Sequence, residues 1–167
     1  EQFKTNPNNM KKFLMCAAAL LMAVTAVSAQ TPEEKEASAK RVEQLKSEAP
    51  KACGVAEIDD AAKTAETVAA ATVEVADFTA LLDGATPSAE QILRATELLQ
   101  RIEGTSGELK QLTEALGKAT SSLKSLKNPM KVKSATRSVS YVKTVLENAT
   151  PELPYQAKLL GAIVSGK

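Results

Sequence analysis

Apolar side chains recur at every third or fourth position through most of the chain after residue 30. This spacing places them on one side of an α-helix, whereas a strand would alternate at every second position. Four stretches show it: Val42, Leu45, Ala49 and Cys53; Ala61, Ala65, Val68, Ala71, Val75, Phe78 and Leu82; Val132, Ala135, Val139, Val142 and Leu146; Leu153, Ala157, Leu160 and Val164. The pattern predicts an all-α protein whose amphipathic helices share one core.

The longest pattern lies between residues 87 and 127 and keeps a seven-residue repeat. Its members are Ala95, Leu98, Ile102, Thr105, Leu109, Leu112, Leu116, Ala119, Leu123 and Leu126. A two-stranded coiled coil favours charged residues beside such a seam. The flanking residues here are mostly small, including Ser106, Thr113 and Thr120. Small flanks let more than one helix approach, so we expect a bundle rather than a free coiled coil.

Gly104 and Gly107 interrupt this heptad-patterned stretch, and each glycine disfavours a helix by about 1 kcal/mol. Thr105 and Glu108 could also form a capping box that starts a new helix. The apolar seam nevertheless passes through these residues in phase. We therefore favour one long, slightly bent helix over two separate ones.

A capping residue followed by proline marks four helix starts, at Thr31-Pro32, Thr86-Pro87, Asn128-Pro129 and Thr150-Pro151. Ser88 with Gln91 is an alternative start for the third helix. Pro50 should kink or end the first helix near Glu48. The sequence thus predicts an antiparallel bundle of four to five helices, with segments at 32–53, 57–83, 87–127, 129–148 and 151–164.

The first 29 residues have the pattern of an export signal. Met10 is followed by Lys11-Lys12, by an apolar run over 13–26 and by small residues up to Ala29. We interpret Met10 as the true start and expect cleavage after about Ala29. The run is too short to span a bilayer comfortably. The remaining residues, 30–167, are expected to form a single helical domain in the periplasm or outside the cell.

Composition excludes many catalytic and cofactor sites. The sequence contains no histidine, which removes the Ser-His-Asp and Cys-His arrangements, Glu-x-x-His di-iron sites and histidine-held haem or zinc. One cysteine after residue 30 cannot build a thiolate metal site. Neither phosphate-loop nor dinucleotide motifs occur. We therefore assign no catalytic, cofactor-binding or metal residues and expect a protein that is not an enzyme.

Carboxylates and Cys53 are the remaining candidates for chemistry. Glu33, Glu34 and Glu36 open the first helix, and Asp59 and Asp60 open the second. They could hold a hard cation or act as an acid and a base, but acids are common at the positive end of a helix dipole. Cys53 continues an apolar helix face, which favours a buried thiol. The alternative is an intermolecular disulfide that links a homodimer.

The most distinctive feature of the sequence is the uneven distribution of charge along the chain. Residues 30–117 hold 17 acidic and 9 basic side chains, whereas residues 118–167 hold 2 acidic and 9 basic ones. No acid occurs between Glu114 and Glu147. The basic residues in that stretch are Lys118, Lys124, Lys127, Lys131, Lys133, Arg137 and Lys143.

This basic segment has three interpretations. It can complement the acidic part inside the bundle, or it can form a surface for an anionic partner such as a lipid headgroup, a polysaccharide or an acidic protein. Nucleic acid is disfavoured, because of export and because no aromatic residues are interleaved with the lysines. Our leading hypothesis is an exported, non-enzymatic binding or structural protein. The alternatives are a carrier of a small apolar ligand between helices and, less favoured, an enzyme that uses carboxylates alone.

Overall fold

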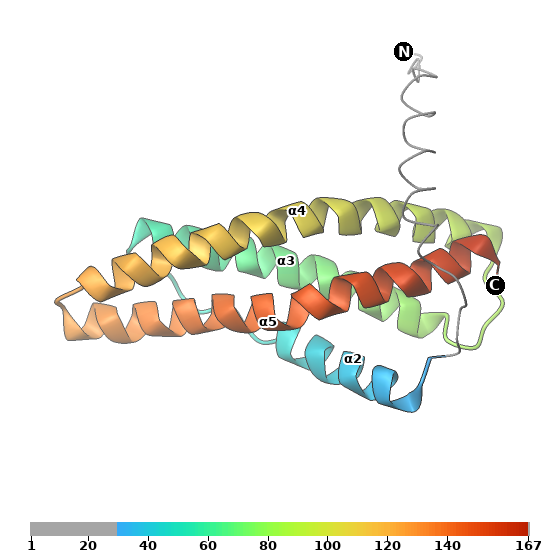
Figure 1. Cartoon of the computed structure of the whole chain (residues 1–167), viewed down its shortest axis with the longest axis horizontal. Coiled ribbons are helices and arrows are strands. Elements are labelled where there is room, and N and C mark those ends of the chain that lie inside the picture. Colours follow the sequence, from blue (N-terminus) through green and yellow to red (C-terminus); the bar gives the residue numbers. More distant parts are fainter. Residues whose placement is uncertain (1–29, 167) are drawn as a thin grey trace, which may run out of the picture.

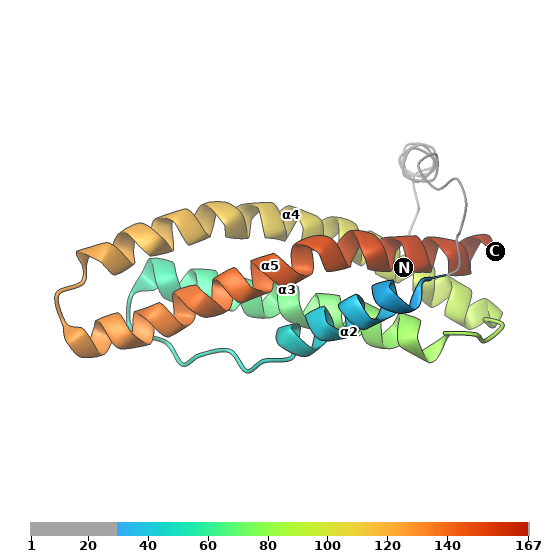
Figure 2. The same cartoon turned by 60° about the horizontal axis from the view of Figure 1, so that its bottom comes forward.

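The computed structural model describes residues 30–166, which form four packed helices and no strand. They are α2 (Pro32–Leu45), α3 (Ala56–Leu81), α4 (Ala89–Ser125) and α5 (Pro129–Ser165). Successive helices run in opposite directions along an elongated bundle (Figures 1 and 2). The predicted all-α bundle is therefore confirmed. The predicted export signal and its cleavage site lie outside the described residues.

Three of the four helix starts use the predicted capping chemistry. The Thr31 hydroxyl accepts the Glu34 N–H at 3.2 Å, and the Glu34 carboxylate accepts the Thr31 N–H at 3.0 Å. Ser88 and Gln91 form the same reciprocal pair at 3.3 and 2.8 Å. α4 therefore begins at the alternative start, because this box satisfies two backbone N–H groups. Asn128 caps α5 through its side-chain oxygen.

α2 is shorter than the predicted helix over 32–53. It ends at Leu45, and residues 46–55 connect it to α3 without helical structure beyond a turn. Pro50 has no N–H and would clash with the carbonyl of Lys46 in a continued helix. Gly54 has φ 75°, a left-handed conformation that glycine adopts without strain. Cys53 therefore lies on this connection and not on a helix face.

The predicted break at Thr150-Pro151 is wrong, because α5 continues through it to Ser165. Pro151 and Pro154 each remove a helical hydrogen bond, at an intrinsic penalty of about 3 kcal/mol relative to alanine. The Thr150 hydroxyl does not cap a new helix and instead donates to the Leu146 carbonyl at 2.6 Å. Both prolines are solvent-exposed, while Leu153 nearby is buried. Packing on the inner side thus outweighs the two missing bonds.

α4 is continuous through Gly104 and Gly107, as the heptad seam predicted. Its buried residues are Ala95, Leu98, Ile102, Thr105, Leu112 and Ala119, all of them members of that seam. The helix packs against both α3 and α5, which a bundle requires and a two-stranded coiled coil does not. None of the helices formed by residues 30–166 is long and apolar enough to cross a membrane.

The core has two parts, one toward each end of the bundle. The first joins Ile58, Val68, Leu112 and Val142 with neighbouring alanines of α3, α4 and α5. The second joins Val75, Ala95, Leu98, Ile102, Leu153 and Leu160. α2 packs more extensively on α5 than it does on α3. It covers only part of the bundle's length (Figure 2).

Candidate functional site

The seven basic residues of the charged segment lie on the hairpin that α4 and α5 form. Lys118 and Lys124 are on α4, Lys127 is in the turn, and the other four are on α5. All seven are exposed. Lys133 and Arg137 are four residues apart and share a helix side, whereas Lys131 points about 200° away from Lys133. The cations therefore surround the end of the hairpin and do not form a single face.

Six of these seven residues take part in none of the ion pairs between described residues. The exception is Lys143, which lies 3.6 Å from Glu147 on its own helix. Acids in the N-terminal part pair with bases of that same part, as in Lys35–Asp83 and Lys46–Asp77. No ion pair described in the structure joins the seven to residues 30–117.

We call the six remaining residues the basic tip: Lys118, Lys124, Lys127, Lys131, Lys133 and Arg137. Each lies within nine residues of the α4–α5 turn, which is about 14 Å along a helix. α4 and α5 have 37 residues each and α3 has 26, so the hairpin is longer than α3 by about 16 Å. Figures 1 and 2 both show the turn projecting beyond the start of α3. The turn at the centre of the basic tip thus extends beyond the rest of the bundle.

The apex of this hairpin carries an exposed apolar residue, Met130, whose exposed fraction is 79%. The Asn128 side-chain oxygen accepts the N–H groups of Met130 at 3.0 Å and Lys131 at 3.4 Å, which holds both residues in the first turn of α5. The other exposed large apolar residues of the described chain are Leu81, Leu93 and Val164. These three lie toward the opposite end of the bundle, so Met130 is isolated among cations.

A second polar site is buried where α2 lies on α5. Glu152 is fully buried, and its carboxylate accepts hydrogen bonds from Ser38 Oγ, Arg41 Nε and Gln156 Nε2, each at 2.6 Å. The Gln156 carbonyl accepts a bond from the Thr79 hydroxyl of α3 at 2.6 Å. The network therefore connects three helices, and we infer that it positions α2.

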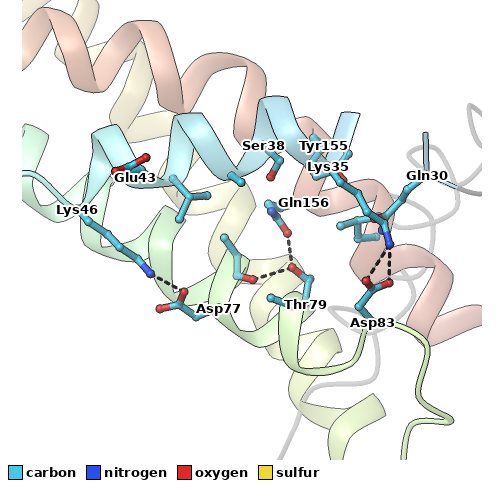
Figure 3. Close-up of a pocket in the computed structure, with 15 residues that line it drawn as sticks. Gln30, Lys35, Ser38, Glu43, Lys46, Asp77, Thr79, Asp83, Tyr155 and Gln156 are labelled. Atoms are coloured by element: carbon cyan, nitrogen blue, oxygen red, sulfur yellow. Dashed lines mark hydrogen bonds and ion pairs between the residues drawn. The ribbon is translucent and has the colours of Figure 1, made fainter. Parts of the chain in front are cut away.

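A groove of about 490 Å³ lies between α2 and α3 beside this network, with α5 residues at its floor. Figure 3 shows Ser38, Thr79, Tyr155 and Gln156 lining the groove. It also shows two ion pairs across the groove, one from Lys35 of α2 to Asp83 just after α3 and one from Lys46 just after α2 to Asp77 of α3. No buried side-chain nitrogen or oxygen among the described residues lacks a hydrogen-bond partner. The buried polar groups at the floor of the groove therefore already have hydrogen-bond partners within the protein.

Cys53 is buried and packs against the first core cluster. The backbone N–H groups of Cys53 and Gly54 donate to the two carboxylate oxygens of Asp59 at 2.8 and 2.9 Å. Burial, and then the nearby Asp59 carboxylate, raise the pKa of the thiol. A cross-link between two copies therefore requires the 46–55 connection to move, and the intermolecular disulfide stays a prediction.

Asp59 holds this connection in place, so its removal should expose the thiol. We expect Asp59→Ala to raise the rate at which a disulfide reagent labels Cys53 by about tenfold or more, because charge-assisted bonds contribute about 1.5–3 kcal/mol. Asp60→Ala, which removes an exposed neighbouring acid, is the matched control and should leave the rate unchanged. Equal labelling of both variants and the wild type would show that Asp59 does not control access.

The same contact should weaken in acid. Burial alone would raise the pKa of Asp59, but the N–H donors of Cys53 and Gly54 outweigh it and lower the pKa below its ordinary value. The stabilisation that the ionised Asp59 carboxylate gives the folded connection is therefore complete above about pH 4. It is lost as the pH falls through the lower pKa that Asp59 has in the folded protein. Labelling with a pyridyl disulfide, which reacts in acid, should accelerate below that point in the wild type and not in Asp59→Ala.

Two of the other acidic candidates have local structural partners. Glu34 completes the α2 capping box, and Glu36 pairs with Lys40 at 2.6 Å. Glu33 and Asp60 are exposed and take part in none of the ion pairs between described residues. Within residues 30–166, no three acidic, cysteine or histidine side chains are grouped as metal ligands would be.

Sequence reasoning missed two functional candidates, Met130 and Glu152. Met130 had a detectable signal, because it follows a helix start and falls outside the apolar series that begins at Val132. Glu152 had no such signal in the sequence, because an acidic residue just after Thr150-Pro151 is what the first turn of a helix commonly contains. Its partners Ser38 and Arg41 are more than 110 residues away in the sequence.

Comparison with known proteins adds no further information about the site. The chain matches no protein-family profile, and no curated protein or solved structure is significantly similar to it.

Proposed function

We propose that the protein is an exported, non-enzymatic binding protein that contacts an anionic partner through the basic tip. The observation that carries this proposal is the gathering of six exposed cations around one projecting turn, none of which forms an ion pair with another residue of the described range 30–166. The periplasmic or extracellular location rests on the pattern of residues 10–29. Both parts of the proposal are open to direct test.

The physical reason is electrostatic. Like charges held within about 14 Å of one turn repel one another, and an anionic partner relieves that repulsion while it releases counterions. None of the ion pairs between described residues joins the tip to the acidic side chains of residues 30–117. Because the tip is exposed, salt should screen the attraction over about 8–10 Å at ordinary ionic strength. Capture should therefore be strong in low salt and weak in high salt.

The carrier hypothesis has less support. The groove beside α2 has a volume typical of small-ligand sites. Its buried polar atoms already bond to one another, and two ion pairs cross between its walls. The carboxylate-only enzyme has less support still, because the acidic candidates Glu34, Glu36 and Asp59 have structural partners.

Charge reversal at the tip tests the proposal. We expect the variant Lys127→Glu, Lys131→Glu, Lys133→Glu, Arg137→Glu to lose retention on a heparin column, used as a sulfated polyanion probe. The wild type should bind at low salt and elute in a salt gradient. Each residue near an anionic surface contributes about 1 kcal/mol, so four reversals should weaken binding by at least about a hundredfold. Circular dichroism would confirm that helix content is retained.

The matched control reverses four exposed lysines elsewhere: Lys40, Lys51, Lys63 and Lys110. This variant has the same net charge as the tip variant. Retention of the control together with loss of the tip variant would support the proposal. Equal elution of the two variants would attribute binding to net charge and would refute a role for the tip.

A further inference from the structure

The apex of the hairpin combines an apolar residue with a surrounding set of cations. Met130 is 79% exposed, and Lys127 and Lys131 lie within three residues of it. Lys133 and Arg137 follow about one and two turns later on α5. Methionine is flexible and apolar, so its transfer from water into an apolar phase at this position would be favourable.

The shape of the basic tip favours a partner with a broad, flat surface over a polymer chain that binds inside a groove. Two grooves of the described structure are lined by α2, α3, the first part of α4 and the last part of α5. Neither contains a residue of the basic tip. The tip surrounds a projecting turn, a shape that can meet a flat surface end-on (Figure 2).

Taken together, we propose that the basic tip docks end-on to an anionic lipid bilayer, with Met130 entering the interface between headgroups and acyl chains. Lysine and arginine stems can lie along the apolar boundary while their charged ends remain among lipid phosphates. A single buried methionine binds a membrane only weakly by itself. We therefore expect stable binding to need both the charge attraction of the cations and the insertion of Met130. This inference rests on the proposed function and names its partner as a lipid surface.

The sequence contains no tryptophan, which permits a test that reports on the apex alone. In Met130→Trp the new indole is the only one in the chain. Mixing with vesicles of equal parts phosphatidylglycerol and phosphatidylcholine should shift its emission to the blue, and brominated acyl chains should quench it. Pure phosphatidylcholine vesicles or high salt should produce neither effect.

Leu93→Trp is the matched control, because Leu93 is 64% exposed and lies toward the opposite end of the bundle. Its emission should not change. This comparison also removes any contribution of the apolar run over 13–26, because the two variants have the same chain ends whether or not that run is cleaved. Cosedimentation provides a second measurement in which Met130→Ser should lower partition into anionic vesicles by about three- to tenfold.

The outcomes separate the two proposals. Equal shifts at positions 130 and 93, or no shift at 130, would overturn docking of the tip to lipid. If heparin retention still depends on the four tip residues in that case, the proposed function stands and its partner is a polyanion or an acidic protein. Loss of both responses would overturn both proposals.

Discussion

Replacing Arg41 with alanine should destabilise the docking of α2 by about 3–5 kcal/mol, the range for removing one partner of a buried ion pair. Glu152 is fully buried, and Arg41 is its only cationic partner among the described ion pairs, at 2.6 Å. The arginine side chain is 21% exposed and also lies over the Tyr155 ring, 5.8 Å from its centroid. Without it, the carboxylate keeps only the neutral donors Ser38 and Gln156.

The loss of stability in Arg41→Ala should first appear as detachment of α2 and only then as unfolding of the whole bundle. α2 has fewer contacts with the bundle than any other helix and joins α3 through a ten-residue connection, so it can detach while the other helices remain packed. Amide hydrogen exchange over residues 32–45 should accelerate in Arg41→Ala. Denaturant unfolding followed by circular dichroism would measure how much of the loss extends to the whole bundle.

Two further variants test the cause. Arg41→Leu combined with Glu152→Leu should recover most of the loss, because an apolar pair removes the buried charge itself. Lys46→Ala breaks an exposed ion pair between α2 and α3 and should change stability by less than about 1 kcal/mol. A loss below about 1 kcal/mol in Arg41→Ala would mean that the network does not position α2.

A second large effect is expected at Leu112, at the centre of the α4 seam. Its side chain is fully buried in the first core cluster. Leu112→Ala should lower the free energy of unfolding by about 2–5 kcal/mol, because it loses buried apolar surface and leaves a cavity. Chemical denaturation would measure the change.

Leu93→Ala on the same helix is the internal comparison. Leu93 is 64% exposed and does not belong to the seam, so its loss should be within about 0.5 kcal/mol. The two substitutions share the same chemistry and similar effects on helix propensity. Equal destabilisation would contradict the assignment of the core, since only burial distinguishes the two positions.

Prediction from sequence succeeded where neighbours along the chain decide the outcome. The Thr31–Glu34 and Ser88–Gln91 boxes join residues three apart, so they can be read from the sequence. The phase of the seam through Gly104 and Gly107 likewise revealed a single α4. The seven basic residues were identified in the same way, although their arrangement around one projecting turn was not.

Prediction failed where distant packing opposes a local preference. Thr150-Pro151 has the local features of a helix start, yet the chain continues in α5 because Leu153, Gln156 and Leu160 are buried against other helices. Cys53 followed the apolar spacing of α2, but Pro50 and Gly54 place it on a connection. A periodic pattern predicts which residues are buried more reliably than it predicts the backbone between them.

The sequence by itself determined that the chain after residue 30 is helical, which side of each helix is apolar and where the cations concentrate, because each depends on interactions within about four residues. Only the tertiary structure decided that α5 passes through two prolines, that Glu152 meets Arg41 and Ser38, and that the basic tip projects beyond α3. Those outcomes depend on relative helix lengths or on contacts between distant residues, 77 positions apart for Thr79 and Gln156 and more than 110 for Glu152 and its α2 partners, and no local pattern encodes them.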